Sequence, residues 1–314
     1  MAKCCTVKRD TDPNLREIEL VKPWKGEKVP DSMVLLEGGE FLMGTEDKDG
    51  HISDGEGPVR KTYVDSFYLD AYAVSNARYL EFIKDTGYRT DAEKYGWSFV
   101  FLPFLPEIGR KDVKQVVRET PWWGAVEGAS WLHPEGPCSS IEDRMDHPVV
   151  HVSWQDAMAF CQWSGMRLPT EAEWEFAARG GTVQKKFPWG DDLNPDGEHR
   201  CNIWQGNFPH ENEAEDEFLG TAPVHTFEPN GYGLYNMTGN TWEWCSDWFS
   251  PFYPREKVYR NPQGPAQGDT KIIRGGSFLC HESYCNRYRV SARTSNTIDS
   301  STTHMGFRCA KDSR

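Results

Sequence analysis

Two cysteines near the C-terminus are the residues whose type and spacing could do chemistry. Cys280 and Cys285 stand five positions apart in the segment 275–289, which reads GGSFLCHESYCNRYR. Five steps separate side chains by about 140° on a helix, and an odd spacing sends them to opposite faces of a strand. Neither regular element brings the sulfurs together, whereas a turn from His281 to Tyr284 would.

Such a turn leaves two alternatives open, and spacing alone does not choose between them. The thiols could close a small structural disulfide, or they could bind a soft metal ion, with Cu(I) preferred by sulfur ligands. Zinc would need further ligands, and none stands at a suitable spacing. Nearby cations lower the pKa of a thiol and favour thiolate. The basic residues around the pair are Arg274, Arg287, Arg289 and Arg293.

The elements that must position the pair begin at recognisable caps. A Ser or Thr ahead of an apolar run predicts a helix start, and an acidic residue three positions later strengthens the prediction. Short strands around a Gly-Gly turn are expected near residues 33–36 and 41–44. The predicted helix starts are Ser75, Ser153 with Asp156, and Thr170 with Glu173, and the stops are Gly87 and Gly180-Gly181.

Composition indicates an α+β domain that is rich in loops and low in regular secondary structure. Gly 28, Pro 20 and Trp 13 among 314 residues favour loops packed by aromatic side chains. Residues 1–31 are polar and predict a leader or surface arm, residues 32–314 predict a single domain, and residues 250–270 predict a long surface loop.

Charge and hydropathy narrow the partners and the compartment. The net charge of −13 disfavours nucleic acid and anionic membranes and suits a cationic partner. No apolar run approaches the ~20 residues of a membrane helix, and the N-terminus has no apolar core of a secretion signal. We therefore expect a soluble, cytoplasmic protein that does not bind nucleic acid or membrane.

Several strings resemble the formylglycine-generating enzymes, also called sulfatase-modifying factors, from about Met33 to Cys309. A wider superfamily shares most of these strings, so they imply only the fold, which is similar to C-type lectins. The segment 275–289 discriminates, because it contains both of the family's cysteines. The shared strings are DGEGPVR at 54–60, RLPTEAEWE at 167–175, NGYGLYN at 230–236, GNTWEW at 239–244 and GFRC at 306–309.

The resemblance implies an oxidase that uses O2 to convert the cysteine of a Cys-x-Pro-x-Arg motif, in an unfolded or nascent sulfatase, to Cα-formylglycine. Cys280 and Cys285 would hold Cu(I), and the substrate thiol would become a third sulfur ligand. No nicotinamide fingerprint offers another oxidant. The residues implied in the oxygen pocket are Ser277, Tyr284 and Trp242. The candidate substrate contacts are Trp122, Trp123, His281 and Arg287.

The resemblance also implies two structural Ca²⁺ sites, although by spacing alone an acidic loop is usually only solvated. Calcium takes six to eight oxygen ligands, often from loops. Some of the implied ligands donate a backbone oxygen and the others a side chain. The first set is Asn202, Ile203, Asp216 and Phe218, and the second is Asn236, Gly239, Thr241 and Glu243.

The other cysteines are given smaller roles. Family members often bridge the positions of Cys161 and Cys309, although a reducing cytoplasm would keep these thiols open. A second bridge of animal relatives is absent, because Ala178 and Val290 occupy its positions. The cysteines expected to be ordinary small buried residues are Cys138, Cys201 and Cys245, and those left unassigned are Cys4 and Cys5.

Two rival functions share the implied scaffold. An iron-dependent sulfoxide synthase would need a histidine triad, typically in an added N-terminal domain, and the first histidine here is His51. A binding module without catalysis would not need paired thiols. The intact pair counts against the module, and a monomeric oxidase is the preferred interpretation.

Overall fold

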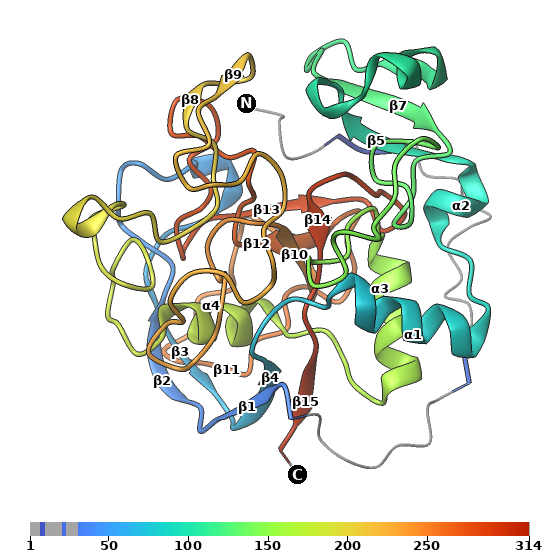
Figure 1. Cartoon of the computed structure of the whole chain (residues 1–314). Coiled ribbons are helices and arrows are strands. Elements are labelled where there is room, and N and C mark those ends of the chain that lie inside the picture. The colour runs from blue at the N-terminus through green and yellow to red at the C-terminus, as the bar shows by residue number, and fades with distance from the viewer. Residues whose placement is uncertain (1–6, 10–20, 23–30, 314) are drawn as a thin grey trace.

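The computed structural model describes residues 7–9, 21–22 and 31–313. Cys4 and Cys5, and most of the predicted leader, lie outside these residues. Over the described part, four α-helices and several small sheets are joined by long loops, which confirms the loop-rich α+β prediction (Figure 1). The helices are α1 Asn76–Thr86, α2 Asp91–Tyr95, α3 Trp154–Ser164 and α4 Glu171–Arg179.

The helix caps follow the predicted chemistry. The side chains of Ser75, Ser153 and Thr170 each accept a bond from a backbone N–H in the first helical turn, and each helix ends at a left-handed glycine. The short helix α2 was not predicted, although Thr90 and Glu93 form a full capping box at its start. The sequence carried that signal in the same Thr-x-x-Glu spacing as at α4.

A four-stranded sheet lies at the centre of the molecule (Figure 1). Strand β10 pairs antiparallel with β12 and parallel with β14, and β12 pairs antiparallel with β13. The loop between β12 and β13 contains both cysteines of the pair, so the sheet fixes the two ends of that loop. The strands are β10 Trp242–Trp248, β12 Lys271–Arg274, β13 Arg293–Asn296 and β14 Met305–Gly306.

Smaller sheets surround the central one. The predicted strands around the first Gly-Gly turn exist, but they join different sheets rather than forming a hairpin. One sheet has the order β1-β4-β15, with β1 Met33–Leu36, β4 Phe67–Asp70 and β15 Ala310–Asp312. Another has the order β11-β3-β2, with β11 Tyr259–Arg260, β3 Arg60–Val64 and β2 Gly39–Met43. The strand β11 interrupts the predicted 250–270 loop.

Sequence reasoning missed the sheet β5-β7-β6 and the hairpin β8-β9. The sheet lies at the upper right of Figure 1, above α2. Its strands are β5 Trp97–Phe101, β7 Trp123–Glu127 and β6 Val113–Val116, and the hairpin strands are β8 Gly206–Asn207 and β9 Glu211–Asn212. The 3-10 helices are Ile52–Asp54, Leu102–Phe104, Glu107–Asp112 and Pro195–Gly197.

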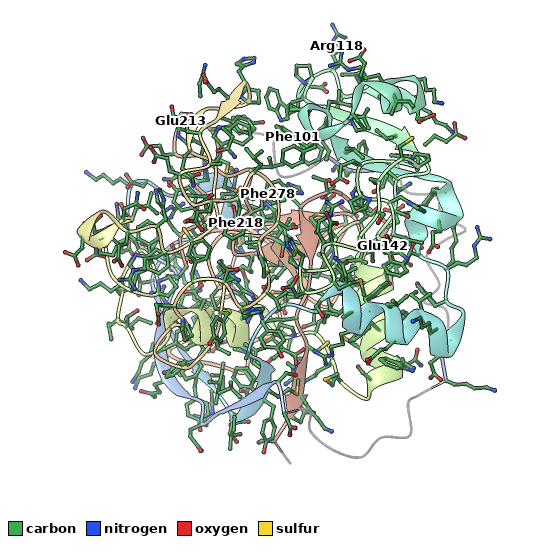
Figure 2. All side chains as sticks on the ribbon, in the orientation of Figure 1. Phe101, Arg118, Glu142, Glu213, Phe218 and Phe278 are labelled. Carbon is green, nitrogen blue, oxygen red and sulfur yellow. The ribbon has the colours of Figure 1, made fainter. Side chains whose placement is uncertain are left out.

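Aromatic side chains fill the core, as the composition predicted. Phe101 and Phe278 lie in the upper interior (Figure 2), and Phe104 links them through ring centroids 5.2 and 5.7 Å apart. Trp174 and Trp242 are fully buried. Each aromatic ring buries a large area, so these contacts stabilise a domain with little regular structure.

Part of the predicted arm packs against the domain. Val7 and Arg9 are buried, and the Arg9 guanidinium lies between the rings of Tyr95 and Trp97, at 4.2 and 4.0 Å from their centroids. The backbone N–H of Arg9 donates to Ser300 Oγ at 2.8 Å. In the described part of the chain, no helix combines the length and the apolar character needed to cross a membrane.

Candidate active site

The loop that carries the cysteine pair is closed by a close backbone approach. Gly276 follows β12 with φ +75°, and a Cβ there would lie 2.9 Å from the carbonyl oxygen of Arg287 and from Cα of Tyr288. Only glycine combines this dihedral with such an approach. The two ends of the loop 277–286 are therefore held against each other.

The predicted turn between the cysteines is present. The backbone N–H of Cys280 donates to the carbonyl of Ser277 at 2.9 Å. The carbonyl of His281 then accepts from the amides of Tyr284, Cys285 and Asn286 at 3.1, 3.0 and 3.1 Å. The chain thus turns twice within ten residues, and each cysteine follows or ends a turn.

The two thiols are buried in the same apolar cluster, and neither is half of a disulfide. Cys280 is 1% exposed and Cys285 is fully buried. Ser277 Oγ lies 4.0 Å from Cys280 Sγ, at the limit of a hydrogen bond to sulfur. The spacing left two alternatives, a disulfide or two thiols that bind a metal ion. The structure has two thiols, and their sulfur atoms are soft donors that suit such an ion.

The predicted effect of the four flanking arginines on the thiols stays a prediction. Each of these arginines pairs with a buried carboxylate that offsets part of its charge. Their role is to fix the backbone on both sides of the loop. The pairs are Arg274 with Glu175, Arg287 with Asp54 at 2.7 Å, Arg289 with Glu56 at 2.6 Å, and Arg293 with Glu171 at 2.6 Å.

An aromatic wall lies beside the pair. The Tyr284 ring stacks on Phe208 with centroids 4.7 Å apart, and it meets the edge of Trp122 at 5.2 Å. Trp122 is half-buried, so it is a candidate for the wall of a groove, whereas Trp123 is buried in the core of β7. The predicted pair of substrate tryptophans therefore divides into one residue at the site and one behind it.

Trp242 and a histidine that sequence reasoning missed form the floor. The Trp242 amide donates to the carbonyl of His304 at 2.9 Å, and the His304 ring lies 4.8 Å from Trp123. Burial lowers the pKa of His304 to about 3, with Cys285 the nearby group that opposes this shift, so the imidazole is neutral. In the sequence, the only signal for His304 was its position just before the GFRC string.

The other predicted substrate contacts differ in accessibility. His281 is half-buried, and its Nδ1 lies 2.8 Å from Ser283 Oγ within the loop itself. Arg287 is 4% exposed and held by Asp54, so it supports the loop from below rather than presenting a charge at the surface. Only His281 of these two stands where a peptide could meet it.

The first predicted calcium set is brought together around Asp216. One carboxylate oxygen accepts from the Ile203 amide at 3.1 Å, and the other accepts from the Phe218 amide at 3.0 Å. Burial raises the pKa of Asp216. The buried Oδ1 of Asn202 has no hydrogen-bond partner among the described residues. A carboxylate and an orphaned amide oxygen are donors that suit Ca²⁺.

The second set runs from the adjoining loop, with Asn236, Gly239 and Thr241, into strand β10, which contains Glu243. Gly239 has φ +77°, and a Cβ there would lie 2.4 Å from the carbonyl oxygen of Asn202, so the two loops touch through their backbones. The buried Oδ1 of Asn236 also has no hydrogen-bond partner within the described residues. This orphaned oxygen fits the predicted ligand.

Glu243 of the second set is already engaged. Its Oε2 accepts from Trp174 Nε1 and Arg308 Nε, both at 2.7 Å, and its Oε1 accepts from Arg308 Nη2 at 2.7 Å. Oε1 keeps a lone pair, so a cation there would share the carboxylate with Arg308. Among the described residues, no three His, Cys, Asp or Glu side chains gather into a metal site.

The remaining cysteines were predicted with partial success. Cys161 Sγ and Cys309 Sγ lie 3.7 Å apart as unbridged thiols. Cys201 and Cys245 are buried, as expected. The prediction for Cys138 is wrong, because this cysteine is exposed in a loop rich in Pro and Gly.

Comparisons with known proteins show the family and the fold of this chain. Residues 19–313 match the family described as a sulfatase-modifying factor enzyme 1-like domain. The chain is 57% identical over 291 residues to the formylglycine-generating enzyme of Thermomonospora curvata, covering 91% of this chain and 95% of the relative. It is 44% identical over 282 residues to the inactive Cα-formylglycine-generating enzyme 2 of Bos taurus, covering 89% and 87%.

Among solved structures, PvdO from Pseudomonas aeruginosa has a TM-score of 0.63 with 23% identity, covering 89% of this chain and 94% of that one. At this identity the likeness shows the fold alone. The bovine relative that is named as inactive is also similar over most of this chain. A shared scaffold therefore does not determine catalytic activity, which depends on the residues of the site.

Proposed function

The chain belongs to the sulfatase-modifying factor family, and from this premise we propose that it is a copper-dependent oxidase that acts on a Cys-x-Pro-x-Arg motif. The family's formylglycine-generating enzymes convert a sulfatase cysteine to formylglycine. The observation that carries the proposal is the pair of buried thiols on a tight turn, Cys280 and Cys285. A scaffold that only bound a partner would gain nothing from such a pair.

The residues of the site divide the work. Cys280 and Cys285 would hold Cu(I), which supplies the electron chemistry for O2 when bound. Ser277 and Trp242 are buried beside the pair and exclude bulk water. Tyr284 and Trp122 form the aromatic wall against which an extended peptide would lie.

Atom balance requires a reductant. One O2 can convert the CH2–SH group of cysteine to an aldehyde, with release of hydrogen sulfide and water. The reaction balances only if two further electrons and two protons are supplied. An external thiol can supply both, because two thiols are oxidised to one disulfide. A reducing, cytoplasmic setting suits this need, and we propose it together with a monomeric enzyme whose acidic surface favours an unfolded, arginine-bearing substrate.

The direct test is a peptide assay. Purified protein loaded with Cu(I) and supplied with O2 and a thiol reductant is expected to convert a Cys-x-Pro-x-Arg peptide to the aldehyde, detected by mass spectrometry. A Ser-x-Pro-x-Arg peptide is the matched control, because it lacks the sulfur that would reach the metal. Unchanged cysteine peptide, with copper demonstrably bound, would refute the proposal.

We also propose that two Ca²⁺ ions stabilise the loops 202–218 and 236–243. Removal of calcium with a chelator is expected to lower the melting temperature before it affects copper, because ions that bind only the folded state stabilise it by mass action. The variant Asp216→Asn should show a smaller drop on chelation than the wild type. A melting temperature that chelation does not change would contradict both sites.

A further inference from the structure

A segment far from the cysteines in sequence holds the end of their loop. Residues 51–56, which we call the clasp, contact residues 285–289 at three points. His51 Nε2 lies 2.8 Å from the carbonyl oxygen of Cys285. The other two contacts are the ion pairs that Asp54 and Glu56 make with Arg287 and Arg289.

The clasp is itself held in shape. The backbone N–H of His51 donates to Glu56 Oε1 at 3.0 Å, and the same oxygen accepts from Arg289 Nη2 at 2.9 Å. Asp54 also contacts strand β13, because its carbonyl accepts from Arg293 Nη1 at 3.0 Å. The backbone of the clasp is therefore held by two ion pairs and by the bond from the His51 amide.

The contact from His51 differs in kind from the other two. A carbonyl oxygen can only accept, so Nε2 must carry the proton. The bond ends on the cysteine residue itself, and fixing the Cys285 carbonyl restricts the rotation that would swing its Cβ and sulfur. The neighbours Glu282 and Ser283 are exposed, so these two side chains add little packing to the turn.

We propose that His51 is a positioning residue that fixes Cys285 for the reaction. The inference rests on the proposed function for what the thiol does, but the restraint itself exists without metal. Partners that orient a metal ligand from outside the ligand set are worth about 10–100-fold in metal affinity or activity. His51 would act in this way through the backbone of the ligand.

Three variants test the role. His51→Ala removes the donor, and His51→Gln keeps an N–H donor at a similar reach, so it should rescue. His225→Ala is the matched control, because that histidine is exposed. We expect His51→Ala to lower kcat and Cu(I) affinity about tenfold with little change in KM, and we expect the other two variants to behave as wild type.

A metal-free measurement separates this inference from the copper proposal. Alkylation of each cysteine is followed by mass spectrometry in the metal-free protein, with buried Cys245 as an internal reference. Cys285 should react several-fold faster in His51→Ala than in wild type, with Cys245 unchanged. Equal Cys285 rates in wild type and His51→Ala would overturn the positioning role, even if the enzyme proved to use copper.

Thermal unfolding distinguishes positioning from plain stability. His51 is half-buried, so its truncation should leave the melting temperature close to that of wild type. A fall in melting temperature that His51→Gln does not restore, with kcat falling in parallel, would mean that the histidine only supports the fold. If the wild-type protein does not bind copper, the proposed function is refuted, while the alkylation result still tests the positioning role.

Discussion

Replacing Cys280 or Cys285 with serine is expected to abolish aldehyde formation and tight Cu(I) binding. A serine oxygen is a hard donor, and Cu(I) needs soft sulfur ligands. With only two thiolates supplied by the protein, either loss halves the donor set. The fall in affinity should therefore exceed the ~10–100-fold typical of losing a partner outside the ligand set. Competition with a coloured Cu(I) chelator measures it.

The matched control is Cys138→Ser, because that thiol is exposed and lies in a separate loop. This variant should bind copper and make product as wild type does. Full Cu(I) affinity in both Cys280→Ser and Cys285→Ser would mean that the metal lies elsewhere. A buried serine hydroxyl lowers stability where it lacks a hydrogen-bond partner, so the melting temperature of each variant is measured to separate lost metal binding from lost stability.

Removal of the Glu175 charge should be the most damaging single change to stability. Glu175 is 1% exposed, and its Oε1 accepts from Arg179 Nη2 at 2.6 Å and from the Gly44 amide at 2.7 Å. Its Oε2 accepts from Arg274. Breaking a buried ion pair costs about 3–5 kcal/mol because a charge is left uncompensated. Glu175→Gln removes the nearest carboxylate from Arg179 and Arg274, of which Arg274 keeps Glu171 at 3.8 Å. Urea unfolding measures the loss.

The surface pair of Glu40 with Lys61 supplies a control, because both side chains are half-exposed. Glu40→Gln should change the unfolding free energy by less than about 1 kcal/mol. Equal effects of Glu175→Gln and Glu40→Gln would contradict the importance of the buried network.

Acid should weaken the same network. Burial alone would raise the pKa of Glu175, but the charges of Arg179 and Arg274 outweigh it and lower the pKa to about 2. An unfolded glutamate titrates near about 4.3. Because the folded value is lower, this contribution is complete above about 4.3 and is lost as the pH falls toward 2. In Glu175→Gln, the acid side of the stability profile should be flatter.

Local chemistry made much of the fold predictable. The caps at Ser75, Ser153 and Thr170 need only neighbours three positions away, and each helix begins where that spacing predicts. The turn between the cysteines is equally local. The turn between the two cysteines could therefore be expected before any tertiary contact was known, whereas the choice between a disulfide and a metal site rested on the family resemblance.

Contacts between distant residues could not be predicted in this way. The carboxylates that pair with Arg287 and Arg289 lie more than two hundred residues away in the sequence. The arginines beside the two cysteines therefore gave no sign that each of them has a carboxylate partner. His51 and His304 were missed for the same reason, since a single histidine carries no spacing. The missed sheet β5-β7-β6 is short and irregular, so its periodicity is weak.

The chain's last residues close structures that its earlier parts begin. Strand β14 lies beside β10, β15 lies beside β4, and Arg308 donates to the carbonyl of Tyr235 at 2.8 Å as well as to Glu243. During translation, the central sheet and the Glu243 carboxylate must therefore wait for residues 305–312 before their contacts are complete. A polypeptide that lacked these residues would contain both cysteines of the pair but could not complete the scaffold around them.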